Sequence, residues 1–295
     1  MTTIKKSSRA HGVLTAITVF MVAVLPTTIA AQSPASPART DGSLAFLPAL
    51  RGDYFRLESR ELGRDYHIYV RLPEGYDANT KRAYPTVYLL DGDTTFPMLA
   101  PLHLFMHYDD KVPEAILVGI AYGGFDRSVN KRHEDFRMVM DDGSMGRAPQ
   151  FLAMLETELI PRIERRFRTR PERRIIVGQS RGGSAVLQAA YRKPGLFWGH
   201  IASNPGREPD TKLLYGMDRE PPDTPRAGHV IVASGSEDRD YLRATTLEWR
   251  DQIGARDDLP WDTRFLDIEG GTHAASLGVA YRRAMQAMFP PQSAD

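Results

Sequence analysis

The sequence predicts an α/β fold in which a mostly parallel β-sheet is covered by helices on both faces. Short, continuous apolar runs, which are typical of strands buried on both faces, recur along the chain. Longer segments with apolar residues every three to four positions lie between them and indicate amphipathic helices. Alternation of strands and helices favours crossover connections and therefore parallel strands.

The first two expected strands differ from the others and should form a hairpin. Residues 54–59, YFRLES, and residues 66–72, YHIYVRL, alternate apolar and polar side chains. This pattern is typical of strands with one exposed face. Only the short segment RELGRD separates them. We therefore expect an antiparallel pair that leads into the parallel part of the sheet.

Six further strands are expected from short apolar runs. They cover residues 86–91, 115–121, 175–178, 200–203, 229–234 and 263–268. Helices are expected over 149–168, 184–193, 241–253 and 273–289. In the first of these helices, Phe151, Leu155, Leu159 and Ile163 recur every four residues and form an apolar stripe. Pro161 should bend or interrupt it, because proline lacks an N–H and clashes with the preceding turn.

The N-terminal segment, residues 1–31, has the layout of a secretory signal peptide. Lys5, Lys6 and Arg9 precede an apolar run over 12–25, and small residues follow. The run is too short to span a bilayer comfortably. We expect cleavage near Ala30 or Ala31, a periplasmic or secreted product, and no stable membrane insertion after removal. The alternative is an anchor that stays attached.

After the signal peptide we expect a flexible lead-in and one domain. Residues 32–50 are rich in Pro, Ser and Ala, which is typical of a loosely ordered segment. No similar stretch interrupts residues 51–290, so these should form a single domain.

Charge and cysteine content exclude several classes of protein. Without the three basic residues of the signal peptide, 35 Lys and Arg face 37 Asp and Glu, a net charge of about −2. A nearly neutral chain offers no strong attraction to nucleic acid. There is no cysteine, which excludes disulfides, thiol catalysis and thiolate metal sites.

Residues 178–182, GQSRG, fit the G-x-S-x-G pattern of a nucleophilic serine. A buried strand precedes the motif and a helix follows it. On such a tight turn the Ser180 hydroxyl projects away from the sheet, and the flanking glycines remove Cβ atoms that would clash. The positive end of the following helix points at the reacting centre. We therefore expect Ser180 to be a nucleophile.

A serine nucleophile needs a histidine base and a carboxylate that orients the base. Downstream of Ser180 the candidates are His200, His229 and His273. The first two begin strands and should lie at the wrong edge of a parallel sheet. His273 follows the last strand in a glycine-rich loop, EGGTHAAS, at the correct edge. We therefore expect His273 to be the base.

The carboxylate should follow the strand over 229–234, where the sequence continues GSEDRD. Asp238 is our first choice for the acid, Glu237 is the alternative, and Asp240 is a distant third. The oxyanion of the tetrahedral intermediate needs two N–H donors. We expect one from Arg181, which follows the nucleophile, and one from Asp93 in the loop after residues 86–91.

Other patterns indicate a substrate contact but no cofactor. Arg127, Lys131, Arg132 and Arg137 follow the fourth strand near the expected site, and Arg132 is our candidate for substrate binding. Residues 123–150 have room to form a small cap. His103 and His107 are spaced as metal ligands on a helix, but without further ligands a plain helix face is favoured. We therefore expect no metal. No glycine pattern typical of nucleotide binding is present either, so no cofactor is expected.

The ordered set of motifs resembles the esterase D, or putative esterase, family of α/β-hydrolases, which includes siderophore trilactone esterases. The resemblance covers about 54–289 and rests on these segments, in order: YHIYVRLPEGYD, YPTVYLLDGD, ILVGIAYG, FLAMLETELIPRIERRF, IIVGQSRGG, GLFWGHIASNP, VIVASGSEDRD and GGTHAAS. It implies an eight-stranded, mainly parallel sheet and a Ser-acid-His site. It also implies an acid three residues after Gly235, which is Asp238, and oxyanion donors at Asp93 and Arg181.

Two segments depart from the family pattern. Arg132-His133-Glu134-Asp135-Phe136 is followed by Arg137-Met138 rather than Thr-Pro, and Ser203-Asn204-Pro205-Gly206 lacks the tryptophan of a Ser-Pro-x-x-Trp run. These changes affect the expected substrate preference but not the catalytic residues. The sequence thus predicts an exported serine esterase that hydrolyses a small-molecule ester, such as a siderophore lactone or a small acyl ester, through an acyl-enzyme. The alternatives are an acyltransferase or a non-catalytic binding protein on the same scaffold.

Overall fold

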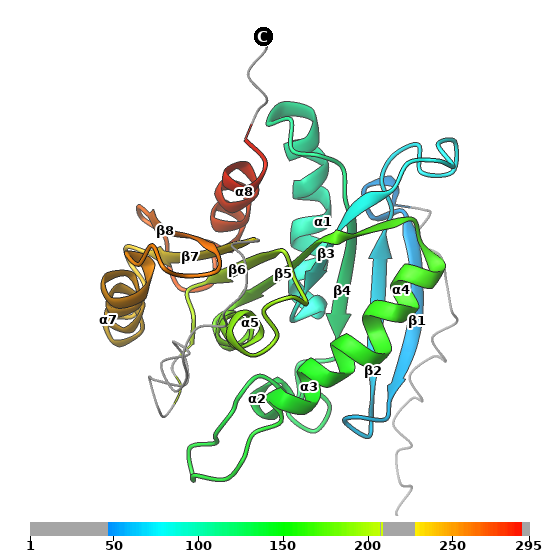
Figure 1. The fold of residues 1–295 in the computed structure, drawn as a ribbon. Helices are drawn as coiled ribbons and strands as arrows, with labels where there is room; N and C mark the ends of the chain where they lie inside the picture. The colour runs from blue at the N-terminus through cyan, green and yellow to red at the C-terminus, as the bar shows by residue number, and fades with distance from the viewer. Residues whose placement is uncertain (1–46, 207, 209–227, 291–295) are drawn as a thin grey trace, which may run out of the picture. The chain divides into compact units, whose positions relative to one another are not determined.

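Eight strands form one sheet in the order β1-β2-β4-β3-β5-β6-β7-β8 (Figure 1). The computed structural model describes residues 47–206, 208 and 228–290. The strands are β1 (Gly52–Ser59), β2 (Arg64–Arg71), β3 (Tyr84–Leu89), β4 (Ile116–Ala121), β5 (Thr169–Gln179), β6 (Gly199–Ser203), β7 (His229–Gly235) and β8 (Asp262–Ile268). A single 3-10 turn, η1 (Pro48–Leu50), precedes β1.

The pairing of the strands confirms the predicted fold class. β1 pairs with β2 as the expected antiparallel hairpin, with Tyr54 opposite Tyr69. β2 also runs antiparallel to β4. All the other neighbouring strands, from β4 through β3 to β8, are parallel. The carboxyl ends of β3 and β5 to β8 therefore meet at one edge of the sheet, where ligands bind in open α/β sheets.

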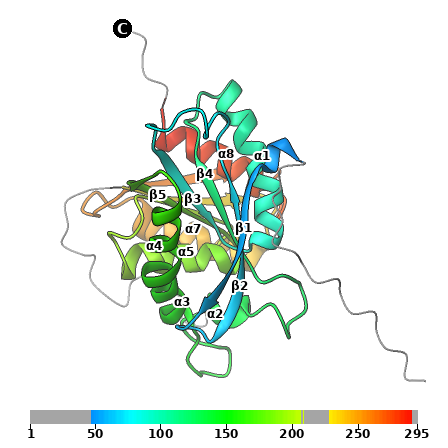
Figure 2. The ribbon, with the colours of Figure 1, turned by 90° about the vertical axis from the view of Figure 1, so that its right-hand side faces the viewer.

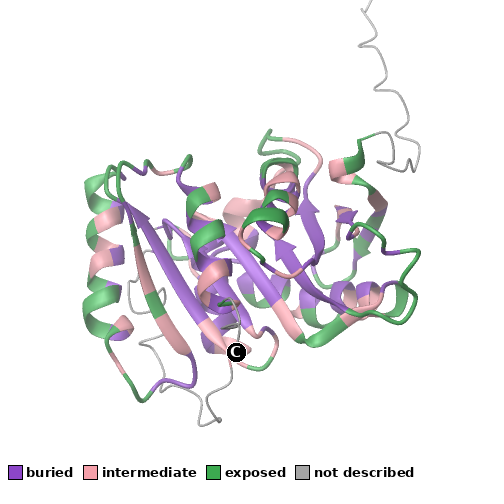
Figure 3. Cartoon of the chain, turned by 90° about the horizontal axis from the view of Figure 1, so that it is seen from above, coloured by how far each residue is buried: buried purple, intermediate pink, exposed green. Residues whose placement is uncertain are grey.

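Helices cover both faces of the sheet (Figure 2). Their bounds are α1 (Gly92–Asp109), α2 (Arg132–Asp135), α3 (Ala148–Met154), α4 (Ile160–Arg166), α5 (Arg181–Arg192), α7 (Asp240–Trp249) and α8 (Leu277–Met288). On one face, α1 and α8 bury residues such as Leu99 and Met285 against Val177 of β5. On the other, α3, α4, α5 and α7 pack on the opposite side chains of the same strands. Figure 3 shows that most strand residues are buried, whereas the helices carry exposed residues on their outer sides.

The helix expected over 149–168 is present but is not a uniform α-helix. α3 ends at Met154, Leu155–Leu159 form one π-helical turn, and α4 continues to Arg166. Pro161 is the second residue after the wide turn, which accommodates the missing N–H and the ring without breaking the helix. The expected interruption thus takes the form of a local widening.

Three other expected boundaries differ from the observed ones by four residues or more. α8 begins at Leu277 rather than 273, because residues 273–276 form a turn, which carries the expected base His273. β5 begins at Thr169 rather than 175. Its first half, TRPERR, is too polar to be recognised as a strand, and it pairs with β3 across a register shift. The helix over 241–253 becomes a π-helical turn after Trp249.

The segment 123–150 contains α2 and is fixed to the sheet by a buried carboxylate. Asp135 accepts hydrogen bonds from the hydroxyls of Tyr66, at 2.7 Å, and Tyr122, at 3.0 Å. Arg64 donates to the same carboxylate at 3.0 Å. Because Asp135 is fully buried, these bonds compensate the cost of removing its charge from water. The segment is therefore held at a defined place beside the carboxyl edge of the sheet.

Residues 1–31 and most of the lead-in lie outside the described residues, so the division into 1–31, 32–50 and 51–290 stays a prediction. Within the described residues, none of the helices combines the length and the apolar character needed to cross a membrane. The same residues contain no group of three or more potential metal ligands. His103 instead contacts the Tyr281 hydroxyl at 2.8 Å and the Pro113 carbonyl at 3.1 Å, and His107 contacts the Val112 carbonyl.

Two buried histidines should make the fold sensitive to mild acid. Burial lowers the pKa of His103 to about 3 and that of His200 to about 4, whereas both titrate near 6.5 in the unfolded chain. Between pH 6.5 and these values the unfolded chain binds more protons, so stability falls as the pH falls, by about 1.4 kcal/mol per pH unit for each group. Urea unfolding of the His103→Gln and His200→Gln variants between pH 7 and 5 should show a shallower loss. A slope equal to that of the unmodified protein would contradict this prediction.

Candidate active site

Ser180 lies on the tight turn between β5 and α5, in a backbone conformation that residues other than glycine rarely adopt. Its φ is 58° and its ψ is −122°. Such a conformation persists only where neighbouring contacts fix it. Here the Ser180 N–H donates to the Ser203 carbonyl at 3.0 Å, and the Gly206 N–H donates to the Ser180 carbonyl at 2.8 Å. The turn therefore holds the serine above the carboxyl edge of the sheet.

The turn closes so tightly that Gly178 has no room for a side chain. A Cβ at this position would lie 2.2 Å from the carbonyl oxygen of Gly182. The last residues of β5 and the first turn of α5 are therefore in contact across the motif. This close approach is the reason for glycine two residues before the serine.

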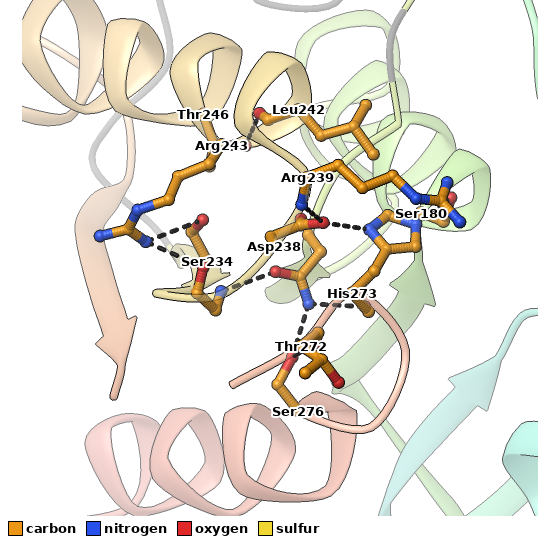
Figure 4. Close-up of polar contacts among 12 residues, drawn as sticks. Ser180, Ser234, Asp238, Arg239, Leu242, Arg243, Thr246, Thr272, His273 and Ser276 are labelled. Atoms are coloured by element: carbon orange, nitrogen blue, oxygen red, sulfur yellow. Dashed lines mark hydrogen bonds and ion pairs between the residues drawn. The ribbon is translucent and has the colours of Figure 1, made fainter. Parts of the chain in front are cut away.

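The His273 imidazole lies between a hydroxyl and a carboxylate (Figure 4). Its Nε2 is 2.9 Å from Ser180 Oγ, and its Nδ1 is 2.8 Å from Asp238 Oδ1. With the proton on Nδ1, the ring donates to Asp238 and accepts from the serine. Three segments that are distant in sequence thus form one chain of hydrogen bonds.

Asp238 differs from the two neighbouring carboxylates in its burial and its direction. Its side chain is fully buried, whereas Glu237 and Asp240 are exposed. Its Oδ1 also accepts the Arg239 backbone N–H at 2.6 Å, which fixes the carboxylate in the turn after β7. Among the three expected candidates in the described structure, Asp238 is therefore the one in contact with His273.

The two other candidate histidines lie elsewhere, as expected from their positions at strand starts. His200 contacts the backbone carbonyl of His229 at 3.1 Å. The His229 ring contacts Asp262, the first residue of β8, at 3.2 Å. Both therefore lie at the amino ends of β6 to β8, away from Ser180.

The backbone N–H groups of Asp93 and Arg181 belong to the first turns of α1 and α5. N–H groups in a first helical turn have no partner within their own helix and are free for a ligand. The two helix starts are adjacent, because a Cβ on Gly182 would lie 3.1 Å from Asp91 Oδ2. The Asp93 carboxylate also accepts the N–H groups of Tyr122 and Gly123 at 2.8 and 2.9 Å. The loop that carries the expected oxyanion donor is thus tied to the end of β4.

Arg132 lies at the site, and its guanidinium is bound to the protein. It donates to both carboxylate oxygens of Asp91, at 2.6 and 2.9 Å, and one nitrogen is 3.4 Å from the Gln179 carbonyl. Asp91 and Gln179 immediately precede the turns that carry Asp93 and Ser180. Arg132 therefore links the two loops that carry Asp93 and Ser180.

A cavity of about 640 Å³ opens beside Ser180. Its lining residues are Arg132, Arg137, Asp141, Ser180, Arg181, Gly206, Glu208, Arg239, Tyr241 and Leu242. Four arginines and two acids give the lining an excess of positive charge. Arg239 extends toward the Ser180 end of the hydrogen-bond chain (Figure 4). Of the expected basic cluster, Arg132 and Arg137 line the cavity, whereas Arg127 and Lys131 do not.

The charges in the cavity are only partly compensated. Arg137 donates to Asp141 at 2.6 and 3.0 Å, and its Nε is 3.9 Å from Glu208 Oε2. Burial raises the pKa of Glu208 to about 7, against the opposing influence of Arg137 and Arg181. The half-buried Arg181 guanidinium has no carboxylate partner among the described residues. Burial, and then the neighbouring Arg132 and Arg137, lower the Arg181 pKa.

Sequence reasoning missed Asp141, Glu208, Arg239, Tyr241 and Leu242 as cavity residues. Asp141 falls in the segment that was expected to form a cap, and the last three follow the predicted acid. The only signal in the sequence was that these four residues lie in, or next to, segments already expected to form the site. Nothing in the sequence near Glu208 indicates that this carboxylate is buried.

Comparison with known proteins assigns the family. Residues 59–274 match the esterase family described as "Putative esterase". The chain is also 31% identical over 276 residues to the ferri-bacillibactin esterase BesA of Bacillus subtilis (strain 168), covering 86% of this chain and 95% of that protein. The chain belongs to this esterase family. The expected resemblance is confirmed, and the esterase is a carboxylic ester hydrolase.

Solved structures with similar folds agree with the architecture of the esterase. The siderophore hydrolase EstB from Aspergillus nidulans matches with a TM-score of 0.68 and 19% identity, covering 80% of this chain and 94% of that chain. An IroE-like serine hydrolase from Shewanella oneidensis matches with a TM-score of 0.65 and 24% identity, covering 80% and 79%. At these identities the similarity establishes the α/β-hydrolase fold of the esterase.

Proposed function

We propose that the esterase cleaves its substrate through an acyl-enzyme on Ser180, with His273 as base and Asp238 as the orienting acid. The observation that carries the proposal is the continuous contact from Ser180 Oγ through the imidazole to Asp238 Oδ1, at 2.9 and 2.8 Å. A serine hydroxyl alone is a weak nucleophile at neutral pH, and this arrangement supplies both the base and the group that orients it.

The reaction then proceeds in two halves. Ser180 Oγ attacks the ester carbonyl as its proton passes to His273 Nε2, and the tetrahedral oxyanion accepts N–H bonds from Asp93 and Arg181. The imidazolium returns the proton to the leaving alcohol as the C–O bond breaks. Water, deprotonated by the same imidazole, attacks the acyl-enzyme. As the bond between the acyl carbon and Ser180 Oγ breaks, the imidazolium returns this proton to Oγ, which releases the acid and regenerates Ser180. Buried Asp238 stabilises the imidazolium throughout.

For the substrate we propose an ester of the siderophore type. Two observations support this class. The relative that spans almost the whole chain is named a ferri-bacillibactin esterase. The cavity beside Ser180 carries four arginines against two acids, which favours a ligand with negative charge. Arg132, one of these four arginines, is the candidate substrate contact, although Asp91 neutralises part of its charge.

A hydrolysis screen of the purified protein tests the proposed function. The panel contains ferric and iron-free siderophore trilactones, feruloyl esters, and short and long p-nitrophenyl acyl esters. We expect turnover of trilactones with a kcat/KM well above that of the neutral acyl esters. Hydrolysis that is confined to neutral acyl esters would contradict the substrate class but not the mechanism. A Ser180→Ala variant that turns over any ester at the unmodified rate would contradict the mechanism.

We also propose export by means of residues 1–31. The support is the basic start, the apolar run over 12–25 and the small residues that follow. Expression of the full chain in a Gram-negative host should give a periplasmic or secreted protein whose N-terminus lies near residue 31 or 32, as read by N-terminal sequencing. A cytoplasmic product that retains Met1 would contradict the proposal, and replacing Val22 and Val24 by Asp provides the matched control.

A further inference from the structure

We infer that Asn204 is a positioning residue, whose side-chain amide holds the His273 loop and the Asp238 turn in register. The inference rests on the proposed function, because it concerns how the base and the acid reach the nucleophile. Asn204 contacts none of the three reacting side-chain groups, which are the Ser180 hydroxyl, the His273 imidazole and the Asp238 carboxylate. It acts through the backbone of the segments that carry them.

Asn204 lies where β6 ends at the carboxyl edge of the sheet. It is 1% exposed and adopts a left-handed backbone conformation with φ of 41°, which asparagine tolerates better than most residues. The preceding residue, Ser203, accepts the backbone N–H of Ser180. The Asn204 N–H itself donates to the Ala233 carbonyl of β7 at 2.8 Å. These bonds anchor the backbone of residue 204 between the strand that leads to Ser180 and the strand that leads to Asp238.

The two ends of the amide reach two different catalytic loops. Oδ1 accepts the N–H of Gly235 at 2.7 Å, at the start of the turn in which the Asp238 N–H returns to the Gly235 carbonyl. Nδ2 donates to the backbone carbonyl of His273 at 2.9 Å and to Ser276 Oγ at 2.6 Å. One rigid, planar group therefore sets the separation of the acid turn and the base loop.

Only an amide can make all of these contacts, because it carries both a hydrogen-bond acceptor and a donor. Gly235 offers a donor and needs an acceptor, whereas the His273 carbonyl accepts and needs a donor. Ser276 uses its own hydroxyl proton for the Thr272 carbonyl, so it too accepts from Asn204. Gln179 gives a second N–H to the same His273 carbonyl. A carboxylate at position 204 would keep the Gly235 bond and place an oxygen against the carbonyl of the base loop.

The test is the Asn204→Asp variant, which preserves side-chain size and tolerance of the left-handed backbone. A fluorophosphonate titrates the fraction of reactive sites, and kcat and KM are then measured per titrated site with a p-nitrophenyl ester. We expect kcat per site to fall by about 10- to 100-fold with KM changed less than threefold, because a displaced base or acid slows proton transfer without weakening ester binding. The Asn79→Asp variant, at an exposed turn, is the matched control and should match the unmodified protein.

A purely structural role for Asn204 gives a different result. It would lower the melting temperature and the titrated fraction while kcat per titrated site stayed normal, and this outcome overturns the inference. If Asn204→Asp does not fold, Asn204→Gly, which retains the backbone conformation, is measured in the same way with the same criterion. The two proposals fail on different results. The proposed function is refuted by a Ser180→Ala variant that stays active, whereas this inference is refuted by a normal kcat per titrated site in the Asn204 variant.

Discussion

Replacement of Ser180 by alanine should lower kcat for a p-nitrophenyl ester by about 10⁴-fold or more. The variant loses the nucleophile, whereas the oxyanion donors and the cavity are unchanged, so ester binding should persist. His273→Ala should cause a loss of similar size, because the hydroxyl at 2.9 Å then has no base. The measurement is kcat and KM of the purified variants, after circular dichroism has shown that they fold.

Two controls make this result specific. Thr157→Ala removes an exposed hydroxyl from the π-helical turn between α3 and α4 and should leave both constants unchanged. The double variant Ser180→Ala/His273→Ala should be no slower than either single variant, since residues that act as a unit are not additive. Strictly additive losses, or a Ser180→Ala variant with normal kcat, would contradict the assigned roles.

The second large effect is expected at the acid. Asp238→Asn keeps the shape of the side chain but removes its negative charge. That charge stabilises the His273 imidazolium and holds the ring in the orientation that proton transfer requires. We expect kcat to fall by about 10³- to 10⁴-fold. Glu237→Gln, one residue earlier and exposed, should leave kcat within about twofold. Both are measured with the same p-nitrophenyl ester at pH 7.5.

The pair Asp238→Asn and Glu237→Gln serves as its own matched control, because each removes one carboxylate charge from the same turn. Equal, small losses in both variants would show that general electrostatics, rather than orientation of His273, account for the effect. A larger loss in Glu237→Gln would assign the acid to the alternative carboxylate.

The parts of the site that the sequence predicted are those marked by local patterns. Gly178 reflects a steric requirement within five residues, because a Cβ there would meet Gly182, whereas a Cβ on Gly182 would meet the distant Asp91. The G-x-S-x-G pattern itself is nevertheless recognisable without knowledge of the fold. His273 was reached by elimination, from the rule that sites lie at the carboxyl edge of parallel strands. For both, the structure gives the expected position, and their catalytic roles stay predictions.

Features that depend on contacts between distant segments were predicted only in part: Asp238 was the first choice for the acid, but its burial was not predicted. Three carboxylates follow β7, and the turn geometry that buries Asp238 and exposes Glu237 is not encoded in residue type. The partners through which Asn204 joins the acid turn and the base loop lie 31, 69 and 72 residues away, so the sequence around Asn204 does not indicate this role. Arg132 was identified as a charge near the site, but its bidentate bond with Asp91 joins residues 41 apart.

The fold shows the same division between local and distant determinants. Buried strands such as β4 and β7 were predicted within one residue because their apolar runs are uninterrupted. The first half of β5 was missed because it is exposed and rich in charged residues, so it lacks the apolar run that marks the buried strands. The start of α8 was placed four residues early, because THAAS has helical composition while the position of His273 requires a turn.

The central claim is a covalent acyl intermediate on Ser180, and rapid-quench mass spectrometry of the intact, purified protein tests it most directly. Mixing the enzyme with a p-nitrophenyl ester and quenching in acid within milliseconds should give a fraction of protein heavier by one acyl group. Peptide mapping should place that group on Ser180, and the Ser180→Ala variant should show none. Full turnover with no acyl adduct at any time, or an adduct on another residue, would contradict the account.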